Sequence, residues 1–158
     1  MTPEQVKLVK ETWSAVIPIQ EKAAELFYGR LFSEYPEVKP LFKGDMQEQG
    51  EKLMNMLDQA VSALDNVESL IEPLKDAGKA HKEYGVSNAD YPKVGACLLW
   101  TLEQGLGDAY NPAVEEAWAA TYETVSSVMI EGANEVVVKP EPVKSKFSWF
   151  QNLFVSRA

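Results

Sequence analysis

Apolar residues recur at intervals of three and four along most of this chain, and this spacing restricts the fold more than any other feature. An α-helix completes a turn in 3.6 residues, so such spacing gathers apolar side chains on one helical face. The clearest stripe consists of Gln49, Leu53, Leu57, Ala60, Val61 and Leu64. No segment of four or more residues alternates convincingly in the manner of a half-buried strand. The pattern therefore predicts an all-α fold.

Prolines, glycines and capping residues divide the chain into about seven to eight predicted helices with short connections. The first helix is expected to begin at Thr2 and Pro3, since threonine caps an N-terminus and proline suits the first turn. Gly85 and the run Gly105-Leu106-Gly107 mark two helix ends, because glycine is the usual residue just after a helix. A short proline-flanked piece is expected over residues 36–42.

The composition changes after residue 135, where two prolines extend a valine-rich stretch. We therefore predict one folded domain over residues 1–135 and a C-terminal extension over residues 136–158, made of a proline-containing linker and an aromatic, basic tail. Three phenylalanines of the tail repeat at three and four residues, so a short amphipathic helix that touches a membrane or a partner is one interpretation. A disordered or self-packed extension is favoured, because about twelve residues form only a marginal helix in water.

The overall composition excludes several classes of protein. A net charge of -9 argues against a nucleic-acid surface, which needs clustered lysine and arginine. The single cysteine, Cys97, rules out an internal disulfide, so a reducing cytoplasm is the expected location. No apolar run approaches the roughly 20 residues that span a bilayer, and the N-terminus lacks the segments of a signal peptide.

The chain has one histidine, His81, on the same helical face as Leu74 and Ala77. On this pattern alone, a hydrogen-bonded core histidine is the commoner explanation. A bare metal ion needs three or four protein ligands, whereas a macrocycle already supplies four nitrogens to its iron. Haem is therefore the metal cofactor that best matches this inventory, with His81 as the axial ligand and with Leu74 and Ala77 beside it.

Gln49 and Tyr28 are the polar candidates for the opposite side of such a site. Gln49 lies one turn before Leu53 and shares its face, so the amide points inward. Each residue alone is ambiguous, because polar residues often border an apolar stripe and a buried tyrosine needs a hydrogen-bond partner in any case.

An ordered set of motifs runs through both halves of the chain. These motifs are Leu26-Phe27-Tyr28-Gly29-Arg30-Leu31-Phe32, Pro40-Leu41-Phe42 and Lys52-Leu53-Met54, followed by His81, Tyr84-Gly85-Val86, Tyr91-Pro92, Val94-Gly95, Leu98-Leu99, Ala117-Trp118 and Tyr122. Over residues 2–132 the set resembles the globin family. The most similar subgroups are bacterial single-domain globins, flavohaemoglobin haem domains and the neuroglobin lineage.

The resemblance implies a role for each matching position. His81 falls at the proximal ligand position of haem b (iron protoporphyrin IX), and Phe42 falls where globins stack a phenylalanine on the haem. Tyr28 and Gln49 fall at distal positions. The residues expected to contact the cofactor are Phe42, Lys52, Leu53, Leu74, Ala77, Val86, Tyr91, Val94 and Leu98. Lys52 is expected to meet a haem propionate or solvent rather than the iron, since a neutral buried amine is costly.

Bound dioxygen carries partial negative charge, which hydroxyl and amide donors stabilise by about 1–3 kcal/mol each in a dry pocket. Carbon monoxide gains much less. Tyr28 and Gln49 are thus expected to favour dioxygen, and as candidate catalytic residues to support the conversion of nitric oxide to nitrate.

Two departures bear on that activity. Flavohaemoglobins carry a lysine just before the proximal histidine and a glutamate near it, whereas this chain has Ala80 and Ala133, with Glu131 and Glu135 displaced. No glycine-rich dinucleotide loop follows a strand, so electrons are expected to come from a reductase partner.

Three functions remain open from the sequence. The leading hypothesis is an oxygen carrier or store that also turns over nitric oxide with an external reductant. The second is a gas or redox sensor that signals through the C-terminal segment, and the third is a haem-free helical interaction module. A second histidine is absent from the chain, so Tyr28, Gln49 or Lys52 are the candidates for a sixth iron ligand in a resting state. The oligomeric state is not predicted.

Overall fold

The computed structural model describes residues 1–135, and the regular secondary structure of these residues consists of helices alone, with no strand, as predicted. The elements in chain order are α1 (Pro3–Val16), η1 (Ile17–Ile19), α2 (Gln20–Glu34), η2 (Pro36–Leu41), α3 (Met46–Ser62), η3 (Leu64–Asn66), α4 (Glu68–Glu83), α5 (Asp90–Leu106), η4 (Gly107–Ala109) and α6 (Pro112–Asn134). The expected proline-flanked piece is the 3₁₀ helix η2. The C-terminal extension predicted over residues 136–158 lies outside the described residues.

Side-chain caps explain where several helices begin. Thr2 and Gln5 form a reciprocal capping box at the start of α1. Asp45 accepts a hydrogen bond from the Gln47 amide at 2.9 Å before α3, and Asn111 accepts one from an amide in the first turn of α6 at 3.0 Å. These caps satisfy backbone donors that have no partner within the helix.

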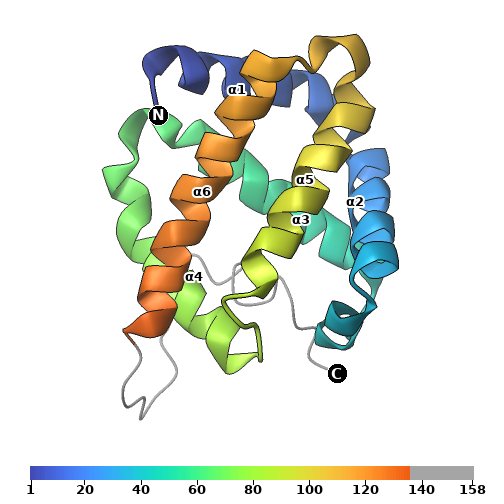
Figure 1. Ribbon diagram of the computed structural model, residues 1–158, viewed down its shortest axis with the longest axis vertical. Coiled ribbons are helices and arrows are strands. Elements are labelled where there is room, and N and C mark those ends of the chain that lie inside the picture. The colour runs from blue at the N-terminus through green and yellow to red at the C-terminus, as the bar shows by residue number, and fades with distance from the viewer. Residues whose placement is uncertain (136–158) are drawn as a thin grey trace.

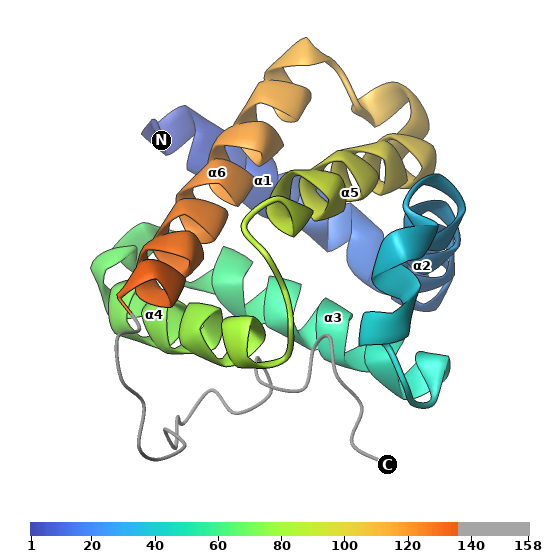
Figure 2. The same cartoon turned by 60° about the horizontal axis from the view of Figure 1, so that its bottom comes forward.

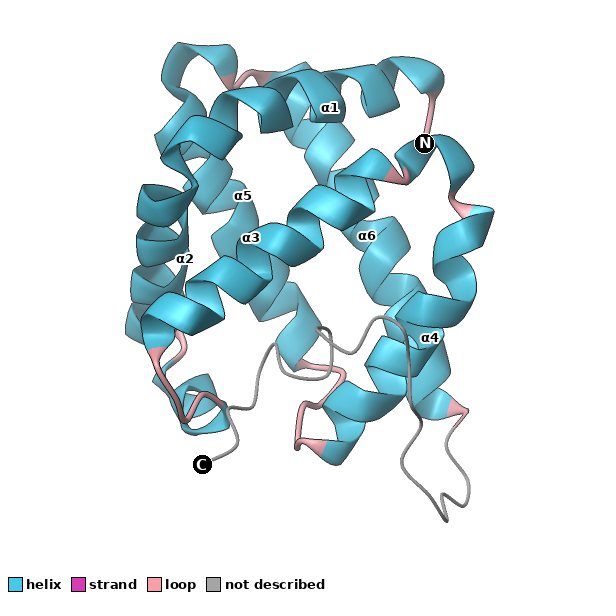
Figure 3. Cartoon of the chain, turned by 180° about the vertical axis from the view of Figure 1, so that it is seen from behind, coloured by secondary structure: helices cyan, strands magenta, loops and turns pink. Residues whose placement is uncertain are grey.

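The helices form two crossed layers. In Figure 1, α5 and α6 lie in front of α1 and α3, while α2 and α4 occupy opposite edges. The reverse view in Figure 3 shows α3 running diagonally across α5 and α6. Figure 2 shows the end of α6 resting against α4. The apolar core lies between these layers.

Two tryptophans join α1, α3 and α6 at the centre of the core. Trp13 and Trp118 are 3% and 1% exposed, with ring centroids 6.1 Å apart. Trp118 donates its indole N–H to Thr12 Oγ1 at 2.8 Å, and Trp13 donates to Asp58 Oδ1 at 2.8 Å. Both indole groups are therefore buried without an unsatisfied donor.

α4 contacts α6 backbone to backbone. A Cβ atom at Gly78 would overlap the Met129 backbone, and one at Gly132 would overlap the backbone of Lys75. The absence of side chains at these two glycines permits the close approach. The packing fixes α4, which contains His81, against the longest helix of the described domain.

No helix among residues 1–135 is both long enough and apolar enough to cross a membrane.

Candidate functional site

His81 lies in the last turn of α4 with no solvent exposure. Its Nδ1 lies 2.6 Å from the carbonyl oxygen of Ala77, one turn earlier. Because a carbonyl only accepts hydrogen bonds, Nδ1 carries the proton and Nε2 has the lone pair. Burial lowers the pKa of His81 to about 4, against a smaller opposing effect of the Ala77 hydrogen bond. The imidazole is therefore neutral near pH 7, as a metal ligand must be.

The turn after α4 is held by several hydrogen bonds. Gly85 has a φ of 100°, which a glycine adopts without strain, and the Val86 amide donates to the His81 carbonyl at 3.0 Å. Asp90 accepts from the Ser87 amide at 2.9 Å and from Lys93 Nζ at 3.1 Å. These contacts fix how the chain leaves the histidine helix and enters α5.

Tyr28 of α2 and Gln49 of α3 are in direct contact. Gln49 Nε2 donates to Tyr28 Oη at 3.4 Å, and the two residues are 3% and 6% exposed, respectively. Burial raises the pKa of Tyr28 far above its ordinary value, so the phenol keeps its proton. From the sequence, both side chains were expected to donate to one bound ligand. In the structure, one amide hydrogen of Gln49 is directed at Tyr28, whose hydroxyl still has its own proton to donate.

Tyr28 also belongs to an aromatic cluster with Phe32 and Phe42. The Tyr28 ring centroid lies 5.4 Å from that of Phe42 and 5.9 Å from that of Phe32, and the two phenylalanines are 5.3 Å apart. Phe42 is half-buried just after η2. The cluster therefore links the predicted stacking residue to the predicted distal tyrosine.

The other residues predicted to contact a cofactor come from α3, α4, α5 and the turn after α4. The buried ones are Leu53, Leu74, Ala77, Val86, Tyr91 and Leu98, and the half-buried ones are Lys52 and Val94. Three of them, Tyr91, Val94 and Leu98, line a cavity of about 60 Å³ between α3, α5 and α6. Lys52 forms no ion pair with any residue in the described range.

Two features of the structure were not predicted from the sequence. The Tyr91 hydroxyl is buried and has no hydrogen-bond partner among the described residues, and burial raises its pKa above the ordinary range. Glu131 and Glu135 each form an ion pair with Lys75, at 3.2 and 2.9 Å. Their carboxylates thus pair with Lys75 at the surface and are not the partners of His81 Nδ1, which is hydrogen-bonded to the neutral backbone carbonyl of Ala77.

The described residues fit a haem. One imidazole ligand suits an iron that brings four nitrogens of its own, and a buried hydroxyl–amide pair provides polar donors on other helices. The remaining candidates are mostly apolar, as a porphyrin requires. Fold and site together define a haem protein of the gas-binding class.

Comparisons with known proteins agree with this class. The family model for Globin matches residues 25–129, and the chain belongs to the globin family. A flavohemoprotein of Halalkalibacterium halodurans is 27% identical over 160 residues, covering 99% of this chain and 39% of that protein. A flavohemoprotein of Rhizobium meliloti is 32% identical over 145 residues, covering 89% and 36%. The chain thus spans about two fifths of the length of these relatives.

Solved structures show the same architecture. A bacterial globin from Campylobacter jejuni aligns with a TM-score of 0.73 at 27% identity, covering 85% of this chain and 97% of that one. A hexacoordinated heme protein from an anhydrobiotic tardigrade aligns with a TM-score of 0.76 at 26% identity, covering 85% and 96%.

Proposed function

We propose that this chain binds haem b through His81 Nε2 and carries or stores dioxygen. The observation that supports this proposal most directly is the buried, neutral imidazole whose Nδ1 is held by the Ala77 carbonyl. That hydrogen bond fixes the tautomer and the ring orientation, as the outer partners of metal-ligating histidines do. When bound, the haem iron supplies the reversible binding of dioxygen and of other diatomic gases such as nitric oxide and carbon monoxide.

The chain's own residues would hold the cofactor from several elements. Phe42 would stack on the porphyrin, Leu53 would cover its distal side, and Lys52 would pair with a propionate. Leu74, Ala77, Val86, Tyr91, Val94 and Leu98 would supply the apolar contacts. The burial of these last residues, half-buried Val94 apart, supports this assignment.

Tyr28 and Gln49 would select among gases. Tyr28 accepts from Gln49 and still has a proton, so it would donate to a gas molecule that carries partial negative charge. A donor that is itself polarised by a hydrogen bond is a stronger donor in a low-dielectric site. The pair would therefore retain dioxygen longer than carbon monoxide.

A second candidate function is nitric oxide dioxygenation. This reaction joins nitric oxide, dioxygen and one electron into nitrate, so it needs a reductase partner or another reductant. The Tyr28–Gln49 pair and the likeness to flavohemoproteins favour it. The neutral partner of His81 Nδ1 favours simple binding instead, because a backbone carbonyl raises imidazole basicity less than a carboxylate does.

Visible spectra of the purified protein in ferric, ferrous and carbon monoxide forms test the cofactor. We expect haem spectra with histidine as the proximal ligand. A colourless preparation that stays colourless when hemin is added would contradict the proposal and leave the haem-free module as the alternative.

Tyr28→Phe tests the hydrogen-bond argument. Removing a hydroxyl donor worth about 1–3 kcal/mol should speed oxygen dissociation about 5- to 150-fold, measured by stopped-flow displacement. The matched control is Tyr110→Phe, because the Tyr110 hydroxyl donates to exposed Glu115 at 3.2 Å. An unchanged oxygen off-rate in Tyr28→Phe would refute the role of the phenol.

A further inference from the structure

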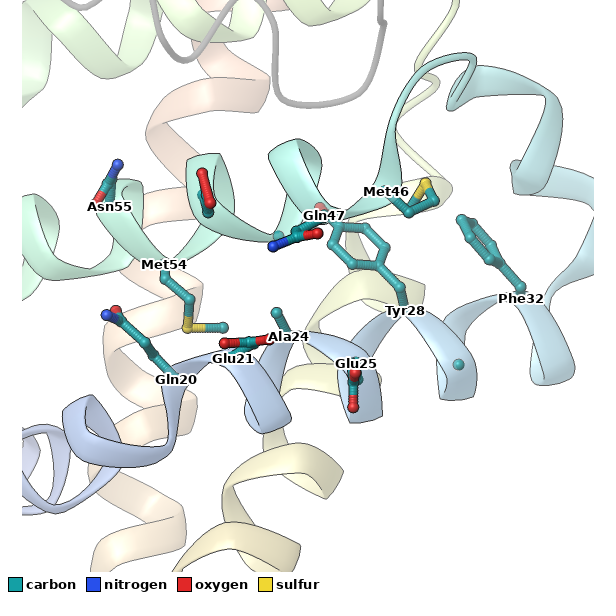
Figure 4. A pocket seen from close by; sticks show the side chains of 13 residues that line it. Gln20, Glu21, Ala24, Glu25, Tyr28, Phe32, Met46, Gln47, Met54 and Asn55 are labelled. Atoms are coloured by element: carbon teal, nitrogen blue, oxygen red, sulfur yellow. The ribbon is translucent and has the colours of Figure 1, made fainter.

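A groove of about 710 Å³ runs between α2 and α3, and Tyr28 is one of the residues that line it. Figure 4 shows Phe32 and Met46 at one end, Gln20 and Met54 at the other, and Tyr28 between them. We call it the α2–α3 groove. Its floor is largely apolar and aromatic, and Ala24 and Gly50 form it where the two helices touch.

The rim of the α2–α3 groove is acidic. Glu21 and Glu25 from α2 and Glu51 from α3 line it, and all three are exposed. No lysine or arginine lines it among residues 1–135. Within residues 1–135, only Glu25 of these three forms an ion pair, with Lys22 Nζ at 3.9 Å, and this pair is so exposed that it contributes little stability. The groove thus suits a ligand that is both aromatic and basic.

The same chain contains a segment of that chemistry. Lys144–Ala158, which we call the tail segment, has five large apolar residues and three basic ones without any acidic residue. Residues 136–158 together carry four basic and one acidic side chain, whereas residues 1–135 carry 11 basic and 23 acidic ones. Residues 1–135 therefore carry a net negative charge, whereas residues 136–158 carry a net positive charge.

We propose that the tail segment docks in the α2–α3 groove of its own chain. Its aromatic side chains would cover the floor around Phe32, Met46 and Met54. Its lysines and arginine would meet the carboxylates of Glu21, Glu25 and Glu51. The segment is defined by sequence alone, since it lies outside the described residues.

The connection is long enough to permit this contact. Eleven residues separate Glu135 from Phe147, and fully extended they span about 36 Å. A domain of 135 residues has a radius of gyration of about 14 Å, which for a compact sphere gives a diameter of about 37 Å, so the span is about as long as the domain is wide. A tether of this kind gives an effective concentration on the order of 1 mM, and even a groove affinity of about 0.1 mM would leave the groove mostly occupied.

A second groove, of about 300 Å³, lies between α5 and α6 and is the natural competitor. The described residues that line it include Leu99, Tyr122 and Ile130 but only one carboxylate, Glu123. This second groove offers apolar contacts, but it lacks the carboxylates needed to pair with the three basic residues of the tail segment. The α2–α3 groove is therefore the better partner for the tail segment.

Docking would also reach the gas-binding side of the domain, a consequence that rests on the proposed function. Tyr28 lines the groove and accepts a hydrogen bond from Gln49. A tail side chain that packs against the Tyr28 ring would therefore shift the position of the Tyr28 hydroxyl. Occupation of the groove would thus set the rate of oxygen release.

Disulfide trapping in the full chain tests the docking itself. Ser148→Cys is combined with Gln47→Cys at the α2–α3 groove or, as the matched control, with Ala119→Cys at the α5–α6 groove; both sites are exposed. Cys97 is 2% exposed and remains in place. We expect intramolecular cross-linking of the Gln47→Cys pair to be at least about tenfold faster under mild oxidation. Equal rates, a faster Ala119→Cys pair or a cross-linked dimer would overturn the proposal.

Removing the carboxylates at the rim of the groove provides a second test. Glu21→Gln, Glu25→Gln and Glu51→Gln together should slow cross-linking of the Gln47→Cys pair about threefold or more, as should high salt. The control triple Glu4→Gln, Glu11→Gln and Glu116→Gln removes three exposed carboxylates elsewhere and should have no effect. Equal slowing in both triples would overturn the electrostatic basis. Unchanged oxygen release in the groove triple, with slowed trapping, would keep the docking and refute its effect on Tyr28.

Discussion

The two sides of the predicted haem site are built in different ways. On the side of His81, α4 rests on α6 with backbone against backbone at Gly78 and Gly132. On the side of Tyr28 and Gln49, α2 and α3 touch at Ala24 and Gly50 and then part into a groove of about 710 Å³.

The α4–α6 contact and the α2–α3 contact differ in how freely their helices can move. A backbone contact leaves no side chain between the helices that can change rotamer, so α4 is held in one place, and the Ala77 hydrogen bond holds the imidazole on it. Helices in contact through small residues beside an open groove have room to adjust. The side that would hold the iron is thus rigid, and the side that would sense the gas is adaptable.

The largest expected effect comes from His81→Ala, which removes the only predicted protein ligand. Haem affinity should fall by more than about 100-fold, since even changes to outer partners of a ligand cost 10- to 100-fold. Hemin titration followed by Soret absorbance measures it. Exposed Glu83→Ala on the same helix is the control, and normal haem spectra in His81→Ala would show that another residue binds the iron.

Glycine-to-alanine substitutions test the rigid side directly. Gly78→Ala forces a Cβ into the Met129 backbone and should lower the free energy of unfolding by about 3 kcal/mol or more. Gly29→Ala in α2 has nothing within 4 Å and should raise it by about 0.5–1 kcal/mol. Urea unfolding compares the two variants. A change of the same sign in the free energy of unfolding of both variants would contradict the distinction between a rigid α4–α6 side and an adaptable α2–α3 side.

Low pH should lower the free energy of unfolding by protonating Asp90, at the start of α5 after the His81 turn. Burial by itself raises the pKa of Asp90, but hydrogen bonds from Ser87 and Lys93 outweigh it, so the pKa lies below its usual value. The carboxylate therefore stabilises the fold above its ordinary pKa of about 4, and this contribution is lost as pH falls through the lower folded value.

Asp90→Asn should consequently be less stable than the wild type by about 1 kcal/mol at pH 7, with the difference shrinking toward pH 3. Urea unfolding across this range measures it, with exposed Asp108→Asn as the control. A difference independent of pH would point to lost geometry rather than lost charge.

Gln49→Leu is expected to have the smallest effect. Its 3.4 Å hydrogen bond to Tyr28 is long, so losing it should speed oxygen release only about threefold, less than Tyr28→Phe does. Stopped-flow kinetics of both single variants and the double variant measures the coupling between them. A Gln49→Leu effect equal to that of Tyr28→Phe would indicate that both donors reach the gas.

Much of the fold was predictable because its signals are local. The caps at Thr2 and Asn111, the turn at Gly85 and the stripe that begins at Gln49 depend on residues within a few positions of each other. The sequence also pointed to His81, since one imidazole on an apolar face is a local feature. Resemblance to a family supplied the positions of Phe42 and Tyr28.

The contacts between distant helices were not predictable in this way. Gly78 and Gly132 are 54 positions apart, and a glycine inside a helix signals only local weakness unless its neighbour is known. The direction of the Gln49 amide depends likewise on where α2 lies relative to α3. The groove between these helices exists only once both are placed.

The two neighbouring indoles of the core give the protein an intrinsic fluorescent reporter. Trp13 and Trp118 are shielded from water with both N–H groups bonded, so their emission should be blue-shifted and insensitive to solvent quenchers. A nearby haem would accept their excitation energy and extinguish it. Cofactor uptake and loss can thus be followed by fluorescence, in the native sequence and without any attached dye.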